Sequence, residues 1–380
     1  MNAGSAGVPA CGAGVPSLWD GHPSLWDGRP SLWDGRPCLW GVLSREGDLF
    51  VSKIKVGIIG CGGISHAHIP LLAKRSDDVE LAAFADIRED AARAAAEGRD
   101  GAVYTTDYRE ILDRVDAVVV CVPTYVHADI VVDLLRKGKH VFCEKPMART
   151  MEQANAILRA SQDTGLPVQV GFVRRFDDEW LAFRKTIQDG RIGRPVIWHD
   201  VASGAGPAPI WFAQDELGGG PFLDGCIHNI DFALHTFGPA EWAFTHGRTM
   251  KSENTAIDTG TATIRFRSGD ELMLTWSWGL PQGCSGARVF EFLGPEGTIT
   301  WPRPAPEGEK HFVVDRGGDK VAEPYPDHAL GQGYDRQIEE FVQVARGKKA
   351  PSAGITEGIE SLRLCLAVLE SARTCKVVQV

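Results

Sequence analysis

The sequence predicts an α/β protein in which a doubly wound parallel sheet is followed by a second α/β domain with an open, mainly antiparallel sheet. Short apolar runs alternate with helical stretches over residues 53–172, and a glycine-rich turn follows the first of these runs. After Gly171, segments rich in Thr, Val, Phe and Trp are separated by glycine-containing turns. The first pattern is typical of parallel sheets and the second of antiparallel ones. We therefore expect one domain over residues 53–172 and another over 173–380.

The elements of the first domain follow from the length of its apolar runs, which fit strands buried on both faces. These runs are Val56–Ile59, Leu81–Ala85, Ala117–Cys121, His140–Phe142 and Val168–Val170. The helical stretches between and after them are His66–Lys74, Glu89–Glu97, Tyr108–Leu112, His127–Arg136 and Met151–Asp163. Thr150 is expected to cap the last of these helices, and Gly165 to end it.

The second domain is expected to begin with a helix over Asp177–Gln188, and a second helix should start near Asp224. Strand-like segments with Gly-containing turns between them then predict an antiparallel sheet. These segments are Thr259–Arg267, Glu271–Trp278, Arg288–Leu293 and Thr298–Trp301. Two final helices are predicted over Asp335–Arg346 and Thr356–Arg373.

Residues 1–52 are expected to lie outside both domains. Near-copies of Ser-Leu-Trp-Asp-Gly-X-Pro occupy residues 17–23, 24–30 and 31–37, and a fourth copy starts at Cys38. A proline and a glycine in every repeat exclude a helical heptad. We interpret the segment as disordered low-complexity sequence, or as the product of an upstream start codon with Val51 as the true initiation site. A Trp-rich interaction tail is the alternative.

The composition excludes several classes of protein. The chain has no apolar run near the roughly 18 residues that a membrane span needs. Its formal net charge is −10 and it lacks a dense Lys/Arg cluster, so we expect no nucleic-acid partner. The nine cysteines are scattered without a CxxC pair, which favours reduced thiols in a cytoplasmic protein.

The glycine-rich turn reads Gly60–x–Gly62–x–x–Ser65 and lies between a predicted strand and a predicted helix. Glycines let the backbone approach a pyrophosphate, and the helix N-terminus supplies free N–H groups. Asp86 ends the next strand, where its carboxylate can accept hydrogen bonds from ribose hydroxyls and repel a 2′-phosphate. The turn thus predicts NAD rather than NADP, although Arg88 leaves dual use open.

Loops after later strands of a parallel sheet face the same crevice as this turn. Pro123, Thr124 and His127 follow one such strand, and Glu144 and Lys145 follow the next. His127 is either a cofactor contact or a helix-capping or packing residue. The predicted cofactor-binding residues are Gly60, Cys61, Gly62, Gly63, Ile64, Asp86, Pro123, Thr124, His127, Glu144 and Lys145.

Three side chains are candidates for catalysis. Lys145 lies where a lysine can stabilise an alkoxide or polarise a carbonyl. Asp224 and His228 are four residues apart, which places them on one face of a helix, where His228 can take a hydroxyl proton and Asp224 can orient it or bind substrate. Asp231 and His235 extend the same face of the predicted helix. We expect these two to pack or cap rather than bind a metal, because one straight helix cannot surround a tetrahedral ion.

The motifs together resemble the Gfo/Idh/MocA oxidoreductase family over about residue 53 to the C-terminus. They are Gly60–Cys–Gly–Gly–Ile64, Asp86, Pro123–x–x–x–His127, Glu144–Lys–Pro146, Gly171–Phe–Val–Arg–Arg–Phe–Asp177 and Gly219–Gly–Pro–Phe–Leu–Asp–Gly–Cys–Ile–His–Asn–Ile–Asp231. The resemblance implies a Rossmann domain, an NAD(P) cofactor and a homodimer or homotetramer built on the open sheets. It implies catalytic roles for Lys145, Asp224 and His228.

Within that family, the run around Arg174 and Arg175 is similar to inositol dehydrogenases. The resemblance implies that one of these arginines lies near substrate and cofactor, so Arg174, Arg175, Asp224 and His228 are the predicted substrate-binding residues. The sequence departs from the common pattern at Val122, where Thr is frequent before the proline. Four tryptophans of the second domain either stack on a sugar face or fill a core. They are Trp198, Trp211, Trp276 and Trp278.

These inferences predict an NAD-dependent dehydrogenase of an inositol, sugar or similar polyol. One alternative is a glycoside hydrolase that retains NAD and oxidises its substrate transiently. The other is a non-catalytic NAD-binding regulator, which would not need Lys145, Asp224 and His228.

Overall fold

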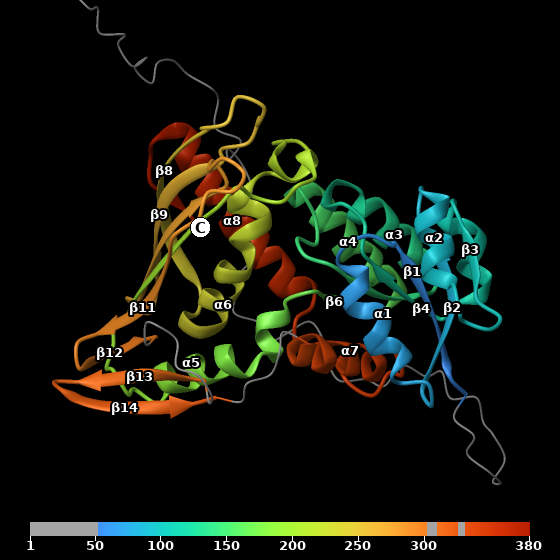
Figure 1. Ribbon diagram of the computed structural model, residues 1–380, viewed down its shortest axis with the longest axis horizontal. Coiled ribbons are helices and arrows are strands. Elements are labelled where there is room, and N and C mark those ends of the chain that lie inside the picture. Colours follow the sequence, from blue (N-terminus) through green and yellow to red (C-terminus); the bar gives the residue numbers. More distant parts are fainter. Residues whose placement is uncertain (1–51, 302–309, 326–330) are drawn as a thin grey trace, which may run out of the picture. The chain divides into compact units, whose positions relative to one another are not determined.

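The computed structural model describes residues 52–301, 310–325 and 331–380. The predictions for the repeats of residues 1–50 and for Val51 lie outside these described residues. Figure 1 shows the helices and strands of the two folded domains, coloured along the sequence.

The described residues of the first domain form a six-stranded sheet in the order β3-β2-β1-β4-β5-β6, in which every pair of neighbours is parallel. The strands are β1 (Ile54–Ile59), β2 (Val79–Ala85), β3 (Val103–Thr105), β4 (Ala117–Val120), β5 (His140–Cys143) and β6 (Val168–Val170). The strand order reverses between β1 and β4, which is where ligands bind in open parallel sheets. The predicted doubly wound sheet is confirmed; β3, with three residues at the sheet edge, was not predicted.

The helices of this domain start and end close to the predicted residues. They are α1 (Ser65–Ala73), α2 (Glu89–Ala96), the 3₁₀ helix η1 (Tyr108–Arg114), η2 (Thr124–Val126), α3 (His127–Arg136) and α4 (Met151–Thr164). The Thr150 hydroxyl accepts from the backbone N–H of Gln153, and Gly165 adopts a φ of 71° at the end of α4. Both predicted caps of α4 are confirmed.

Helix α7 (Gly331–Ala345) belongs to the first domain by packing, although it lies near the end of the chain. Ile338, Phe341 and Val342 are buried in the same hydrophobic cluster as β1 and α1. Arg75, in the turn just after α1, also pairs with Asp335 at 2.7 Å. The expected boundary near residue 173 therefore separates the two sheets but not all the helices.

The described residues of the second domain form a nine-stranded sheet in the order β14-β13-β12-β11-β7-β10-β9-β8-β15. The strands are β7 (Ile197–Ser203), β8 (Ala240–Arg248), β9 (Thr259–Phe266), β10 (Glu271–Ser277), β11 (Arg288–Gly294), β12 (Gly297–Thr300), β13 (His311–Arg316), β14 (Asp319–Pro324) and β15 (Val378–Gln379). β7 and β10 pair in parallel and the other neighbours antiparallel. The predicted mainly antiparallel sheet is confirmed, but β7, β8, β13, β14 and β15 were missed.

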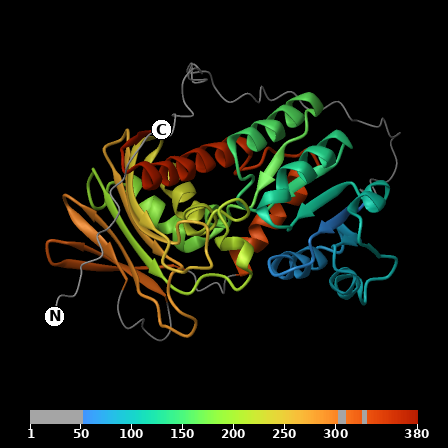
Figure 2. The same ribbon diagram turned by 90° about the horizontal axis from the view of Figure 1, so that it is seen from above.

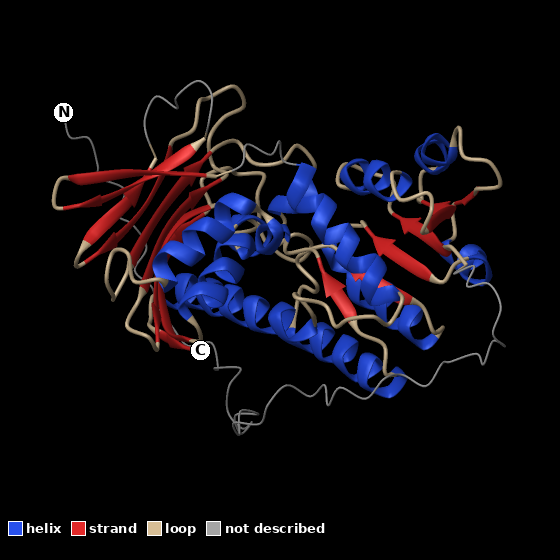
Figure 3. Ribbon diagram, turned by 90° about the horizontal axis from the view of Figure 1, so that it is seen from below, coloured by secondary structure: helices blue, strands red, loops and turns tan. Residues whose placement is uncertain are grey.

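Helices cover one face of this sheet and leave the other uncovered (Figure 3). The helices of the second domain are α5 (Asp178–Gln188), α6 (Ile227–Phe237) and α8 (Ile355–Thr374), with short turns η3 (Val173–Phe176), η4 (Ile210–Ala213) and η5 (Pro221–Gly225). α8 packs on β8 and α6 and also on α4 and β6 of the first domain (Figure 2). The core beneath α5 is aromatic, with Trp198 fully buried between Trp180 and Phe292. Trp198 is therefore a core residue, one of the two roles considered for it.

Gly60 occupies a position that no other residue can take without strain. Its φ is +88°, and a Cβ on it would lie 2.6 Å from the backbone of Cys121. We expect Gly60→Ala to lower the free energy of unfolding by roughly 3 kcal/mol. Urea denaturation followed by circular dichroism measures this difference.

The control for this substitution is Gly63→Ala, because a Cβ at Gly63 would meet no heavy atom within 4 Å. Its stability should stay within about 1 kcal/mol of the wild type. Equal losses in the two variants would contradict the steric account of Gly60.

Candidate active site between the two domains

The glycine-rich turn leaves an open surface at the N-terminus of α1. A Cβ added to Gly62 or Gly63 would contact nothing within 4 Å, so the face of the turn is free for a phosphate group. Ser65 is fully buried, and its hydroxyl donates to the carbonyl oxygen of Gly62 at 2.6 Å. The small side chain of Ser65, at the third defined position of the glycine-rich turn, thus lets α1 start close to β1. The turn fits a dinucleotide pyrophosphate.

Asp86 lies beside this turn at the end of β2. Its carboxylate accepts from the backbone N–H of Cys61 at 2.8 Å and from that of Arg88 at 2.9 Å, while Arg88 Nε lies 3.6 Å away. Each carboxylate oxygen can accept further hydrogen bonds, so these contacts orient Asp86 and leave it able to bind a ribose diol. Burial, with the charge of Asp86, raises the pKa of the Cys61 thiol to about 12, so this residue contributes its backbone N–H and no thiolate.

His127 joins the loops that follow β4 and β5. The ring is buried, with Nδ1 2.7 Å from the carbonyl oxygen of Pro146 and Nε2 2.8 Å from that of Val122. Burial lowers the pKa of His127, so at neutral pH the ring is uncharged and donates through one nitrogen at a time. These contacts fit the packing role considered for His127. Pro123 lies on the loop after β4, and Thr124 begins η2.

Glu144 lies beneath the cofactor loop. One carboxylate oxygen is 2.7 Å from Nε2 of His68 on α1, and the other accepts from the backbone N–H of Lys145 at 3.0 Å. A Cβ on Gly171 would lie 2.8 Å from this carboxylate, so a glycine is needed there. Burial alone would raise the pKa of Glu144, but the hydrogen bond and charge of His68 and the charge of Lys145 lower it. The side chain therefore links α1 to Lys145 as a carboxylate.

Lys145 and Asp224 meet across the junction of the two domains. The ammonium of Lys145 donates to the backbone oxygen of Asp224 at 3.1 Å and to its carboxylate at 3.2 Å. The two side chains are 17% and 9% exposed, so the pair is shielded from water but still reachable. Asp224 lies on η5, a turn of π-helix, and α6 begins only at Ile227. The prediction that Asp224 and His228 share one α-helix is thus wrong, because the π-turn inserts an extra residue.

His228 lies in the first turn of α6 and is half-buried, and its Nδ1 has no hydrogen-bond partner among the described residues. Burial, followed by the charges of Lys145 and Arg174, lowers the pKa of His228 well below its ordinary value. The ring is therefore neutral at pH 7 and able to accept a proton. In the described part of the chain, Asp224 makes hydrogen bonds to Lys145 and none to His228, so it does not orient the imidazole directly.

The two arginines of the Phe-Val-Arg-Arg-Phe run have different surroundings. Arg175 makes a buried, bidentate ion pair with Asp231 at 2.8–3.1 Å, which gives Asp231 the packing role expected of it. Arg174 donates to the side-chain oxygen of Asn229 at 2.9 Å, and its guanidinium carbon lies 3.9 Å from the ring centroid of Trp180. Burial lowers the pKa of Arg174 to about 10. Arg174, next to Asn229 and near His228, is thus closer to the candidate chemistry than Arg175.

Sequence reasoning missed Asn229 and Asp200, which extend this polar cluster into the sheet. Asn229 bonds to the buried carboxylate of Asp200 on β7, whose other oxygen lies 4.0 Å from Arg288. Burial raises the pKa of Asp200. β7 was not recognised as a strand, and a single Asp200 within it gives no local signal of its contact with Asn229.

Two further observations concern possible ligands and membranes. Within residues 52–301, 310–325 and 331–380, no three His, Cys, Asp or Glu side chains are placed to hold a metal ion. The same residues contain no helix with the length and apolar character of a membrane span.

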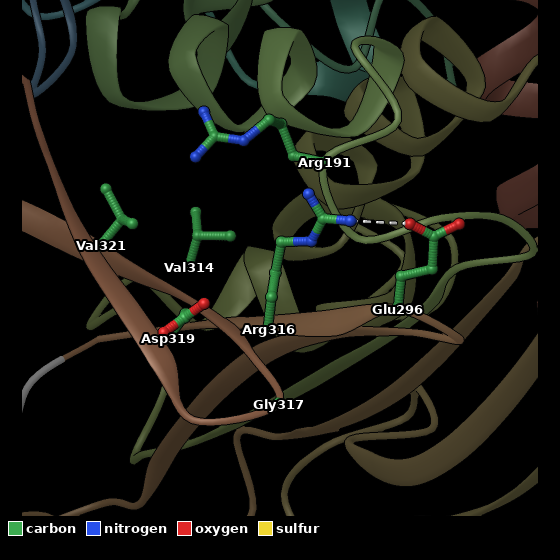
Figure 4. Close-up of a pocket in the computed structure, with 7 residues that line it drawn as sticks. All are labelled: Arg191, Glu296, Val314, Arg316, Gly317, Asp319 and Val321. Carbon is green, nitrogen blue, oxygen red and sulfur yellow. Dashed lines mark hydrogen bonds and ion pairs between the residues drawn. The ribbon is translucent and has the colours of Figure 1, made fainter.

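A hollow of about 570 Å³ lies beside β13 and β14 of the second domain (Figure 4). Its lining includes Arg191, Val321 and the ion pair of Arg316 with Glu296 at 3.0 Å. None of Lys145, Asp224 and His228 lines it. The hollow is therefore separate from the candidate chemistry.

Comparisons with known proteins match both domains to one family. Residues 54–172 match the model described as oxidoreductase family, NAD-binding Rossmann fold, and residues 180–300 match the Gfo/Idh/MocA C-terminal domain. The chain is 29% identical to inositol 2-dehydrogenase of Rhizobium meliloti (strain 1021), over 84% of this chain and 96% of that protein. It is 25% identical to scyllo-inositol 2-dehydrogenase (NAD(+)) of Bacillus subtilis (strain 168), over 86% and 96%.

A solved structure extends the likeness of the fold to both domains. The WlbA dehydrogenase from Bordetella pertussis, in complex with NADH and UDP-GlcNAcA, superposes with a TM-score of 0.73 at 24% identity, over 87% of this chain and 99% of that one. The similarity to that enzyme concerns the fold alone.

The pH dependence of stability tests the burial of α6. Burial, with the charges of Arg175 and Arg184, lowers the pKa of His235 in the last turn of α6 to about 4. Below about pH 6.5 the unfolded chain binds a proton at this residue that the folded chain does not, so acid favours unfolding. Urea midpoints should show His235→Gln gaining stability relative to the wild type between about pH 7 and pH 5.

The matched control is His246→Gln, at an exposed position of β8. It makes the same substitution outside α6, so the urea midpoints of the two variants can be compared at each pH. A pH-independent difference for His235→Gln would contradict the burial of its imidazole.

Proposed function

Because this chain belongs to the Gfo/Idh/MocA family of NAD-binding oxidoreductases, we propose that it transfers hydride between a hydroxyl-bearing carbon of a cyclic polyol or sugar and NAD. One observation supports this most. Lys145 of the cofactor domain meets Asp224 of the second domain beside a neutral His228, at the end of the sheet that carries the glycine-rich turn. An ammonium next to a free base is the set that alcohol oxidation needs.

The residues that fit NAD are the turn Gly60–Ile64, Asp86 and the loops around Thr124 and Lys145. When bound there, the nicotinamide supplies the hydride acceptor. His228 takes the proton of the substrate hydroxyl, since its ring is uncharged at neutral pH. Lys145, held by two hydrogen bonds to Asp224, stabilises the developing alkoxide.

The substrate class follows from the relatives. The relatives from Rhizobium meliloti and Bacillus subtilis are named inositol 2-dehydrogenase and scyllo-inositol 2-dehydrogenase (NAD(+)). The match to this chain covers 96% of the length of each. These names give no support to a redox-assisted glycoside hydrolase. A non-catalytic regulator is also disfavoured, because Lys145, Asp224 and His228 are brought together in a shielded position.

We expect Lys145→Ala and His228→Ala each to reduce kcat at least about 100-fold, because each removes a group that acts on the reacting hydroxyl. The measurement is NADH absorbance with saturating NAD and a panel of inositols and aldoses. Quenching of tryptophan fluorescence by NADH should show that both variants still bind the cofactor.

Lys139→Ala is the matched control for Lys145. Its ammonium binds the carbonyl oxygen of Val115 at the opposite end of β5, so turnover should remain within about twofold of the wild type. Full turnover by Lys145→Ala would disprove the proposed mechanism.

The pH profile tests which group is the base. Because the pKa of His228 lies well below its ordinary value, kcat/KM for oxidation should stay level as the pH falls from about 8 to 6.5. An acid limb with a midpoint at or above about pH 6.5 would contradict a neutral His228.

We also propose that a second copy of the chain covers the open face of the nine-stranded sheet. Large apolar side chains are exposed there, on strands whose other face is buried: Phe244 is 42% exposed, Met273 37% and Val289 40%. An uncovered apolar sheet face is typical of an oligomer contact.

Phe244→Glu should therefore shift the protein toward the monomer in size-exclusion chromatography with light scattering, because it places a charge in the proposed contact. Tyr104→Glu, at a 44% exposed position on β3, is the control and should leave the mass unchanged. A monomeric wild type would refute the contact.

A further inference from the structure

The tryptophans of the second domain differ in what they contact. Trp198 is in the core, and Trp276 and Trp278 pack beside Gly225, within 3.4 Å of the position that a Cβ there would take. Trp211 instead lies on η4 and faces the cofactor domain, where the ring centroid of Tyr125 is 6.4 Å from its own. Of these four, it is the one whose ring meets an aromatic ring of the first domain in the described structure.

Trp211 continues a row of rings that leads to the catalytic turn. It stacks on Phe212 at 3.7 Å, Phe212 meets the edge of Trp278 at 6.3 Å, and Trp278 packs against Gly225, next to Asp224. At the other end, Tyr125 lies between the predicted cofactor residues Thr124 and His127. The row of rings thus runs from the cofactor loop at Tyr125 to the turn η5, where Asp224 binds Lys145.

The segment that carries Trp211 is anchored on both sides. The carboxylate of Asp215 accepts from Arg373 of α8 at 2.7 Å, and its backbone oxygen accepts from Arg149 of the cofactor domain. The backbone oxygen of Trp211 accepts from the N–H of Gly218 at 2.9 Å. These contacts keep the ring of Trp211 in place before any ligand arrives, which lowers the entropic cost of binding.

The rings of Tyr125 and Trp211, which meet edge to face, keep surface and polar groups available. Tyr125 is 38% exposed and Trp211 is half-buried. Among the described residues, neither the Tyr125 hydroxyl nor the Trp211 indole N–H makes a hydrogen bond. A part-exposed aromatic with an unused donor suits a ligand that has an apolar ring face and hydroxyls at its edge.

We propose that Tyr125 and Trp211, one from each domain, form the outer wall of the substrate site and bind the ring of a cyclic polyol. The C–H face of the substrate ring packs on the Trp211 indole, and its hydroxyls bond to the indole N–H and the Tyr125 hydroxyl. This inference rests on the proposed function and adds two specificity-determining residues to it.

The test measures KM for the polyol and the affinity for NADH separately. Trp211→Ala should raise KM about tenfold or more, because it removes both the ring face and the N–H, and should leave the NADH dissociation constant within about twofold. Trp211→Phe keeps a ring and should recover most of the loss. Tyr125→Phe should raise KM by a few-fold, since about one hydrogen bond is lost.

Trp242→Ala is the matched control, because Trp242 lies on β8 at the sheet edge that pairs with β15. Its KM should not change. A Tyr125→Ala/Trp211→Ala double variant should lose less than the product of the single effects, as expected for two residues that bind one ring.

Two results would overturn the proposed outer wall and leave the proposed function standing. One is a Trp211→Ala variant with the turnover and KM of the wild type. The other is a Trp211→Ala variant whose affinity for NADH falls as much as its affinity for the polyol. If Trp211→Ala does not fold, Trp211→Phe and the Tyr125 variants decide the question. A wild type that binds NADH and oxidises no cyclic polyol would overturn the proposed function as well, so the two failures are distinguishable.

Discussion

The buried carboxylate of Glu144 is the contact on which the cofactor side of the site depends. It binds His68 of α1 and the backbone N–H of Lys145, and Gly171 leaves the space that it occupies. Because α1 starts at the glycine-rich turn, this carboxylate sets the position of the turn relative to Lys145. Leaving a buried polar group without its hydrogen-bond partner typically costs about 1–3 kcal/mol, and more for a carboxylate, so this geometry has little freedom.

The other half of the site is built on a turn that is itself shaped by glycine. A Cβ on Gly220, which has a φ of +73°, would lie 2.8 Å from Ala256, so the chain enters η5 in a conformation that only glycine adopts easily. The π-turn that follows directs the backbone oxygen and the carboxylate Oδ1 of Asp224 toward Lys145. His228 is left uncharged beside an ammonium, a separation of roles that suits proton removal and alkoxide stabilisation.

Local rules were sufficient for much of the fold and part of the site. The glycine-rich turn, Asp86 at the end of β2 and the caps of α4 depend on residues close in sequence, so each could be predicted from spacing and residue type. The missed strands carry weaker signals: β7 alternates Trp198 and Asp200 on its buried face, and β15 has only two residues. The packing of α7 on α1 could not be predicted, because its cluster joins residues more than 250 positions apart.

The sequence by itself determined which chemical groups are available and where the cofactor turn lies, since a strand, a glycine turn and a helix N-terminus are encoded within about a dozen residues. Only the tertiary structure decided which groups meet. Lys145 and Asp224 are 79 residues apart, and Arg175 and Asp231 are 56 apart. The sequence pattern did not distinguish Arg174 from Arg175 as the substrate-binding arginine. In the structure Arg175 pairs with the buried carboxylate of Asp231, and Arg174 lies near His228. Such pairings depend on how sheets and helices pack across the whole chain, and the periodicity of a single element carries no information about them.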